Sequence, residues 1–405
     1  MTFEAPKSVL ETTLPVSPRQ AFGGRDVYGF PKAMRVGDTV YVGAQTDLEG
    51  GPIGSQTATA FQSLADLLRA AGSDMSELVN LRTYYLYNGE RGAEETAYWE
   101  EMTEVRLRYL ADPGPAATAV RVAGMPTPTN LIGIDGIAEI GAEKQKLMPA
   151  DFWDWSMPVP FVQGWRLSDM LYLGGQISAD TEGRAVAAND WAEQTRKTLA
   201  FIHKVLVEGG LDWPDLATMR ICYQHTGDDI AAKKGLETIL AIVRETLPEP
   251  LPALTCFGVD LLYEGLVLEI DGYAPVGPRE RITPPGLDTW VRYDDFPTAY
   301  RSGDKVFVGG VSAPGGASLS AQCEASLDRL GNTLRAAGAS YEHLVKLTLF
   351  YVPETPDADA EPDVIAIAKA IEDYLPGPGP VVSILRVNGL PFHGQRMQLD
   401  ALAID

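Results

Sequence analysis

The chain has 405 residues, 45% of them hydrophobic, and a formal net charge of −22 from 55 acidic and 33 basic residues. A chain this acidic, without a cluster of Lys and Arg, lacks the positive surface that nucleic acids and anionic membranes require, so we expect neither as a partner. The apolar content is enough for packed cores, and roughly two to four domains are expected at this length.

Targeting and metal-binding signals are missing from the sequence. We find no secretory leader and no apolar run long enough to cross a membrane. The three cysteines and four histidines are scattered, without the spacing of a zinc or redox site. We therefore expect a cytoplasmic protein that uses no metal or other cofactor.

In chain order, the first predicted element is a hairpin that recurs three times. Residues 35–44 (RVGDTVYVGA) return as 166–175 (RLSDMLYLGG) and as 301–310 (RSGDKVFVGG). Each begins with a Gly-Asp or Ser-Asp turn signal and continues into a β-branched and aromatic run, which predicts a hairpin turn followed by a strand. Each strand ends in small residues, where another group can approach the backbone closely.

The elements that follow also recur in all three copies. Apolar residues at helical spacing, closed by glycine, predict helices over 56–72, 191–210 and 319–338. Strands are expected at 78–87, 216–224 and 344–352, second helices at 93–109, 229–246 and 362–374, and closing strands that contain Asp135, Asp271 and Asp400. Identical aspartates in diverged copies favour a structural role near a common axis.

This order predicts an α+β unit with helices on one face of a mixed sheet. The strands are apolar on both sides, so we expect three units to bury their free faces around a common axis. The predicted domains are residues 1–145, 146–280 and 281–405.

These motifs resemble the Rid (YjgF/YER057c/UK114) family. The segments Val42-Gly-Ala-Gln45 and Leu173-Gly-Gly-Gln176 match its strand ending, and Arg69-Ala-Ala-Gly72 matches its helix ending. The resemblance implies three tandem Rid-like (chorismate mutase-like) domains that form an intramolecular pseudo-trimer. It also implies small-molecule clefts between neighbouring domains, and it leaves open whether the pseudo-trimer assembles further.

The resemblance also implies positions for the functional residues. Hydrolytic Rid proteins deaminate enamines and imines, and a strand arginine holds the substrate carboxylate. The matching positions here are Ala117, Leu254 and Val382. The missing arginine predicts that simple imines derived from amino acids are poor substrates.

The family glutamate on the closing strand matches Gly133, Glu269 and Gln398, so only the second copy keeps the acid. We therefore expect a cleft lined by Leu254, Cys256 and Glu269, with Phe161 and Gly175 as further matches to family cleft positions. Glu269 and Cys256 are the catalytic candidates, Glu269 as a base or proton shuttle and Cys256 favoured as part of the wall.

Three other residues are candidates for substrate binding. Arg121 and Arg386 lie four residues beyond the lost arginine position, on the same strand face, and could form a relocated anion clamp. An interdomain ion pair is the favoured alternative for both. The first copy has only small residues at its cleft positions, which predicts a roomy cleft with Tyr84 among its aromatic walls.

The sequence thus favours a cofactor-independent enzyme that acts on a small reactive metabolite, by hydrolysis or tautomerisation of an enamine or imine. Two alternatives stay open, a Rid-like protein that binds a small molecule without turnover and a chorismatase-like enzyme on the same scaffold.

Overall fold

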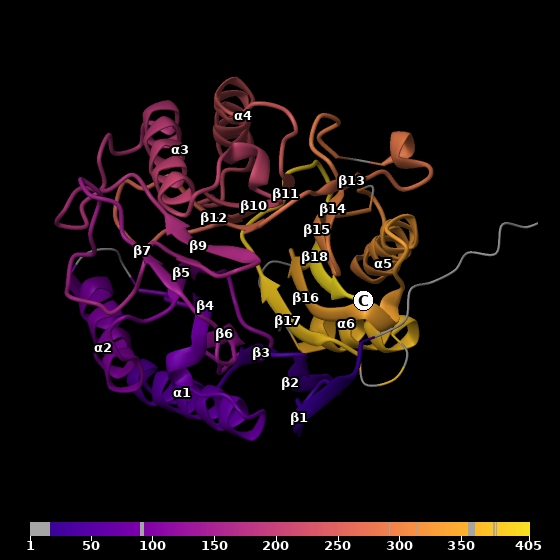
Figure 1. Ribbon diagram of the computed structural model, residues 1–405, viewed down its shortest axis with the longest axis horizontal. Helices are drawn as coiled ribbons and strands as arrows, with labels where there is room; N and C mark the ends of the chain where they lie inside the picture. The colour runs from indigo at the N-terminus through magenta and orange to yellow at the C-terminus, as the bar shows by residue number, and fades with distance from the viewer. Residues whose placement is uncertain are drawn as a thin grey trace, which may run out of the picture.

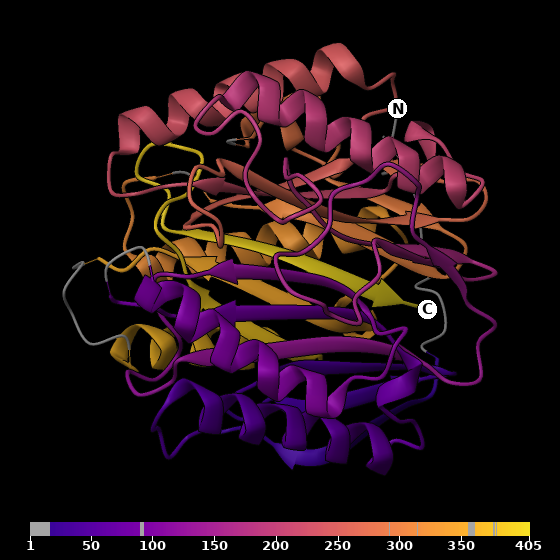
Figure 2. The same cartoon turned by 90° about the vertical axis from the view of Figure 1, so that its left-hand side faces the viewer.

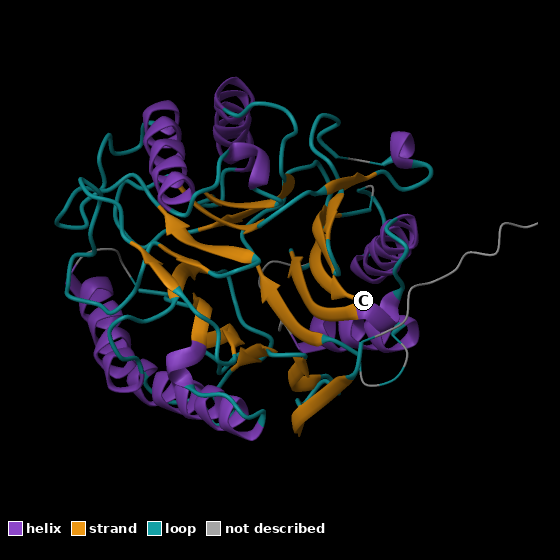
Figure 3. Ribbon diagram, viewed as in Figure 1, coloured by secondary structure: helices purple, strands orange, loops and turns teal. Residues whose placement is uncertain are grey.

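Three six-stranded sheets occupy the interior of the protein, and each is built from one copy of the sequence motif (Figures 1 and 3). The structure is a computed structural model that describes residues 17–405, apart from 90–92, 291, 314, 355–360, 376 and 378. We call each sheet with its two long helices a unit. The described elements confirm the expected α+β class and pseudo-trimer.

The first unit has the strand order β1-β2-β3-β6-β4-β5. Its elements are β1 (Arg19–Arg25), β2 (Pro31–Val36), β3 (Thr39–Gln45), α1 (Ile53–Ala70), β4 (Leu78–Tyr85), α2 (Ala93–Tyr109), β5 (Ala116–Arg121) and β6 (Ile132–Glu139).

The second unit has the order β11-β10-β12-β9-β8-β7. Its elements are β7 (Gln145–Leu147), β8 (Gly164–Arg166), β9 (Met170–Gln176), α3 (Trp191–Glu208), β10 (Thr218–Gln224), α4 (Asp229–Thr246), β11 (Ala253–Val259) and β12 (Leu268–Pro275).

The third unit has the order β13-β14-β15-β18-β16-β17. Its elements are β13 (Glu280–Ile282), β14 (Ala299–Ser302), β15 (Lys305–Val311), α5 (Leu319–Ala336), β16 (Leu344–Tyr351), α6 (Glu361–Tyr374), β17 (Val381–Arg386) and β18 (Met397–Ile404). Short 3₁₀ turns occur at Met75–Glu77, Trp213–Asp215, Leu287–Thr289 and Tyr341–His343.

The repeated turn signal forms the predicted hairpins. Val36 pairs with Thr39 and Ser302 pairs with Lys305, so each turn has two central residues. Gly37 and Gly303 both have φ of +59°, which a tight hairpin turn requires at that position.

Helices lie on the outside and strands face the centre (Figure 3). Figure 2 shows the helices of the first and second units on opposite outer faces, with the strands between them. Each helix pair packs on its own sheet in a separate apolar core. A further core between the sheets takes aromatic side chains from all three units, among them Tyr41, Trp165 and Phe307.

Neighbouring units meet in the same way three times. The edge strand of one unit packs on the next unit's hairpin strand: β5 on β9, β11 on β15 and β17 on β3. The arrangement closes on itself, as expected of a pseudo-trimer. No helix in the described part of the chain has the length and apolar character to cross a membrane.

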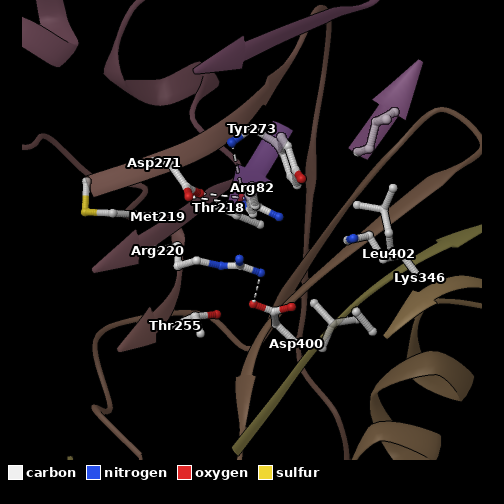
Figure 4. Close-up of a pocket in the computed structure, with 13 residues that line it drawn as sticks. Arg82, Thr218, Met219, Arg220, Thr255, Asp271, Tyr273, Lys346, Asp400 and Leu402 are labelled. Atoms are coloured by element: carbon white, nitrogen blue, oxygen red, sulfur yellow. Dashed lines mark hydrogen bonds and ion pairs between the residues drawn. The ribbon is translucent and has the colours of Figure 1, made fainter. Parts of the chain in front are cut away.

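The three aspartates of the closing strands join the units through ion pairs, and Figure 4 shows those of Asp271 and Asp400. Arg82 Nη2 lies 2.8 Å from Asp271 Oδ1, and Arg220 Nη2 lies 2.7 Å from Asp400 Oδ2. The third pair is Lys346 Nζ to Asp135 Oδ1, at 2.9 Å, and each pair connects two different units. The three aspartates thus make the same kind of contact between units in all three copies.

Candidate functional site

A cleft lies at each of the three contacts between units. One wall comes from the edge strand of one unit, and the other comes from the hairpin and closing strands of the next. The first cleft, between the first and second units, has a cavity of about 40 Å³. Ala117 and Ala119 of β5 face Gly175 of β9 and Glu269 of β12 across it.

The other two clefts carry no carboxylate at the position of Glu269. In the second cleft Leu254 and Cys256 of β11 face Gln398 of β18, around a cavity of about 40 Å³. In the third, Val382 and Ile384 of β17 face the first unit across a larger cavity of about 210 Å³.

The structure thus separates residues that we had expected in one cleft. Glu269, Phe161 and Gly175 line the first cleft, whereas Leu254 and Cys256 line the second. Strand β10 lies between the strands of Cys256 and Glu269, so these residues are two strands apart, roughly 10 Å. They contact different neighbouring units, because β11 is an edge strand and β12 lies inside the sheet.

The same geometry changes the expectation for the first copy. Its small residues do not share one roomy cleft. Ala117 and Ala119 belong to the first cleft with Glu269, whereas Gly133 adjoins Ala44 and Thr46, which line the third. The roomy cleft is therefore the third, and its edge strand is supplied by the third unit.

Glu269 is held in place by its backbone surroundings. Its side chain is buried, with the residue 7% exposed, and the backbone N–H of Ala119 donates a hydrogen bond to its carboxylate. Gly175 leaves the space that the carboxyl group occupies, because a Cβ at this position would overlap it. Burial, and secondly the charge of Asp271, raise the pKa of Glu269 to about 8.

A long connection between β7 and β8, residues 148–163, supplies an aromatic wall for this cleft. The ring centroids of Trp153 and Trp155 are 4.7 Å apart, and those of Trp155 and Phe161 are 5.9 Å apart. Trp153 Nε1 donates to Gln176 Oε1 at 3.2 Å, which fixes the first of these rings. These rings make one side of the cleft that holds Glu269 apolar.

Sequence reasoning missed Arg106, which also lines the first cleft. It lies on the inner face of α2 and is 2% exposed. Its guanidinium carbon lies 5.9 Å from the ring centroid of Trp99 and 6.0 Å from that of Phe161. The signal was present in the sequence, since an arginine occurs where helical spacing predicts a core residue.

A family model described as Endoribonuclease L-PSP matches residues 26–140 and 156–276, more than half of the chain. The chain belongs to this family, the Rid (YjgF/YER057c/UK114) family.

Several solved structures are similar to this chain. A chorismatase covers 81% of this chain and 93% of its own, with 13% identity and a TM-score of 0.54, which shows a shared fold. A YjgF/YER057c/UK114 protein from Mycobacterium tuberculosis is 24% identical, covers 30% of this chain and 100% of its own, and has a TM-score of 0.27. A Rid protein from Yersinia pestis is 23% identical over 33% of this chain and 100% of its own, with a TM-score of 0.28.

The other candidates from the Rid resemblance lie in contacts between units. The Tyr84 hydroxyl accepts from Arg220 at 3.2 Å and donates to Asp135 at 3.4 Å, so it belongs to the ion-pair network. Arg121 Nη1 lies 2.9 Å from Glu95 Oε1 and 3.2 Å from Asp260 Oδ2 of the second unit. Two carboxylates thus already neutralise Arg121, in the ion pair that we had favoured.

Arg386 also lies at a contact between units, where its backbone pairs with residues 123 and 124 of the first unit. Cys256 is buried, and burial raises the pKa of its thiol, so it is uncharged at neutral pH. Its backbone N–H donates to Gln398 Oε1 at 3.2 Å. This environment fits a cleft wall better than a nucleophile.

Within the part of the chain that the structure describes, no group of three or more His, Cys, Asp and Glu side chains is arranged to hold a metal ion.

Proposed function

We propose that this Rid-family chain is a cofactor-independent enzyme that hydrolyses or tautomerises an enamine or imine in the first cleft. Glu269 is the proton-transfer group. The observation that carries the proposal is the placement of this buried carboxyl group, with its pKa raised to about 8, in an aromatic-walled cavity. General acid–base groups work best when their pKa lies near the working pH.

The chemistry follows from the protonation state. At neutral pH most Glu269 is protonated, so it can donate its proton to the β-carbon of a bound enamine and leave an iminium ion. The resulting carboxylate then accepts a proton from water as its oxygen adds to the iminium carbon. Loss of ammonia from the adduct gives the keto product, and proton transfer without water gives a tautomer.

A second function is favoured by the third cleft. Its cavity of about 210 Å³ is the largest of the three, and Gly133 stands where the family acid is found. A pocket with space but without an acid at the family position supports binding of a small molecule without turnover.

The chorismatase-like alternative has the support of the shared fold alone. Chemistry on a substrate with two carboxylates calls for two cationic partners. Among the described residues that line the first cleft, Arg106 is the one cation.

The proposal is tested by Glu269→Gln, which removes the proton donor and keeps the shape. Turnover of a panel of enamines and imines, followed by ammonia release, should fall by about 10²-fold or more. The melting temperature should not fall, because a neutral amide has no buried charge to desolvate. Gln398→Ala, at the equivalent position of the second cleft, is the matched control and should keep full turnover. Equal rates for Glu269→Gln and the unmodified protein would sink the assignment.

A further inference from the structure

One buried cation of the protein has no carboxylate partner among the described residues. Four Lys and Arg residues are buried in this part of the chain: Arg82, Arg106, Arg220 and Lys346. Three of them form the ion pairs between the units. Arg106 has no carboxylate partner among the described residues. The free-energy cost of removing its guanidinium group from water is nevertheless as large as for the arginines between the units.

The guanidinium group of Arg106 has two nitrogen atoms that the described residues leave unpaired. Its Nε and Nη2 are buried and have no hydrogen-bond partner among the described residues. In Arg82 the same two atoms hold both oxygens of Asp271, with Nε at 3.3 Å and Nη2 at 2.8 Å (Figure 4). Burial lowers the pKa of Arg106 to about 10, so the group stays charged at neutral pH.

A comparison between the three units shows that this arginine is specific to the first cleft. The helices α2, α4 and α6 are each followed by a leucine whose N–H donates to the carbonyl four residues earlier. These bonds run from Leu110 to Arg106, from Leu247 to Val243 and from Leu375 to Ile371. The equivalents of Arg106 are therefore Val243 and Ile371, which are fully buried aliphatic core residues.

Arg106 and Glu269 occur together in the first cleft, and the other two clefts have neither group at the equivalent positions. They line the same cavity, and the Tyr263 hydroxyl lies close enough for both charges to influence its pKa. The strand position of the Rid clamp is Ala117 in this cleft, so the strand supplies no competing cation. The cavity of about 40 Å³ is small, which favours a small ligand.

We propose that Arg106 binds the carboxylate of a small, planar monocarboxylate substrate through Nε and Nη2, and so places its reacting carbon against Glu269. This inference rests on the proposed function and adds the substrate class. It also replaces the expectation that small imines derived from amino acids are poor substrates, because the cation missing from the strand is supplied by helix α2. A paired contact of this kind favours a carboxylate over a neutral isostere.

Binding of pyruvate and of pyruvamide, its neutral isostere, tests the inference without turnover. Trp99 is close to the guanidinium, so tryptophan fluorescence can report occupancy of the cleft. The unmodified protein should bind pyruvate at least about tenfold more tightly than pyruvamide. Arg106→Val, which copies the second unit, should abolish the preference, and Arg106→Gln gives the same test if the valine variant does not fold.

Arg108→Gln is the matched control, because it removes a charge from the exposed side of the same helix. It should keep the preference for pyruvate. An equal preference in Arg106→Val and the unmodified protein overturns the inference, as does a lack of preference in the unmodified protein. If the preference depends on Arg106 but no enamine or imine is turned over, the proposed function fails and the carboxylate site stands.

Discussion

The carboxyl group of Glu269 is neutral at pH 7 because of its immediate neighbours. Burial is the larger cause, and the second is Asp271 on the same strand. The pKa of Asp271 is itself lowered, because the charges of Arg82 and Arg220 outweigh its burial. The ion pairs between the units therefore keep one carboxylate ionised, and that charge helps to keep the neighbouring carboxyl group protonated.

The activity should depend on pH through Glu269. Proton donation to an enamine needs the protonated form, so kcat/KM should be highest below pH 8 and fall as the pH rises through about 8. Initial rates between pH 6 and about pH 9.5 give the profile, with substrate stability measured at each pH. Gln398→Ala should show the same descending limb. A rate that stays constant across this range would contradict proton donation by Glu269.

At the scale of elements, the connection before the second strand of each unit sets the size of the cleft. Residues 26–30 join β1 and β2, whereas residues 148–163 and 283–298 join the equivalent strands of the other units. The longer connections bring Trp155 into the first cleft and Trp290 into the second. The third cleft has only the short connection at its wall and keeps the largest cavity.

The residue near the end of each hairpin strand (β3, β9 and β15) is matched in size to the side chain opposite it on the closing strand. Gly175 faces Glu269 and Gly310 faces Gln398, and a Cβ at either glycine would overlap the opposing side chain. In the first unit the pattern is reversed, because Ala44 faces Gly133. A glycine is therefore found where the closing strand carries a long polar side chain.

Gly175→Ala should consequently move the carboxyl group of Glu269. We expect about 1–3 kcal/mol of destabilisation from overpacking and a loss of turnover of roughly 10-fold or more from the displaced carboxyl group. Gly310→Ala crowds Gln398 in the same way and is the matched control. It should cost similar stability in chemical denaturation but leave turnover intact. Full activity in a folded Gly175→Ala variant would argue against a fixed position for the carboxyl group.

The sequence was sufficient to predict the helices and strands of each unit, because hairpin signals and helical spacing act within one copy. The second helices show this, since 93–109 and 229–246 were predicted with the bounds that α2 and α4 have. The composition of the clefts was not predicted, because each cleft joins strands from different copies. Cys256 and Glu269 were grouped because both match family cleft positions within the second copy, which does not show the neighbour that each strand contacts. Arg106 could have been found by aligning the three helix ends.

At the scale of the whole molecule, covalent linkage lets the three contacts differ. Two of the ion pairs that the closing-strand aspartates form between units use arginine, whereas the third uses Lys346. The clefts differ more strongly, because one has both Glu269 and Arg106, and the others have neither at the equivalent positions. A homotrimer could not confine such a change to one cleft. The structural contacts have thus kept their charges in all three copies while the clefts diverged.

The ion pairs should carry much of the cohesion between units, and Asp271→Asn tests this. The substitution leaves the buried Arg82 without its counter-charge, with an expected cost of about 3–5 kcal/mol in the free energy of unfolding. Chemical denaturation at pH 7 measures it, and Asp66→Asn, at an exposed ion pair with Arg69, should show no measurable change.

Because the pKa of Asp271 is lowered in the folded protein, its contribution is present above the unfolded pKa of about 4 and is lost as the pH falls further. The stability difference between Asp271→Asn and the unmodified protein should therefore shrink in acid. A difference below about 1 kcal/mol at pH 7 would show that apolar packing, and not this ion pair, holds the first and second units together.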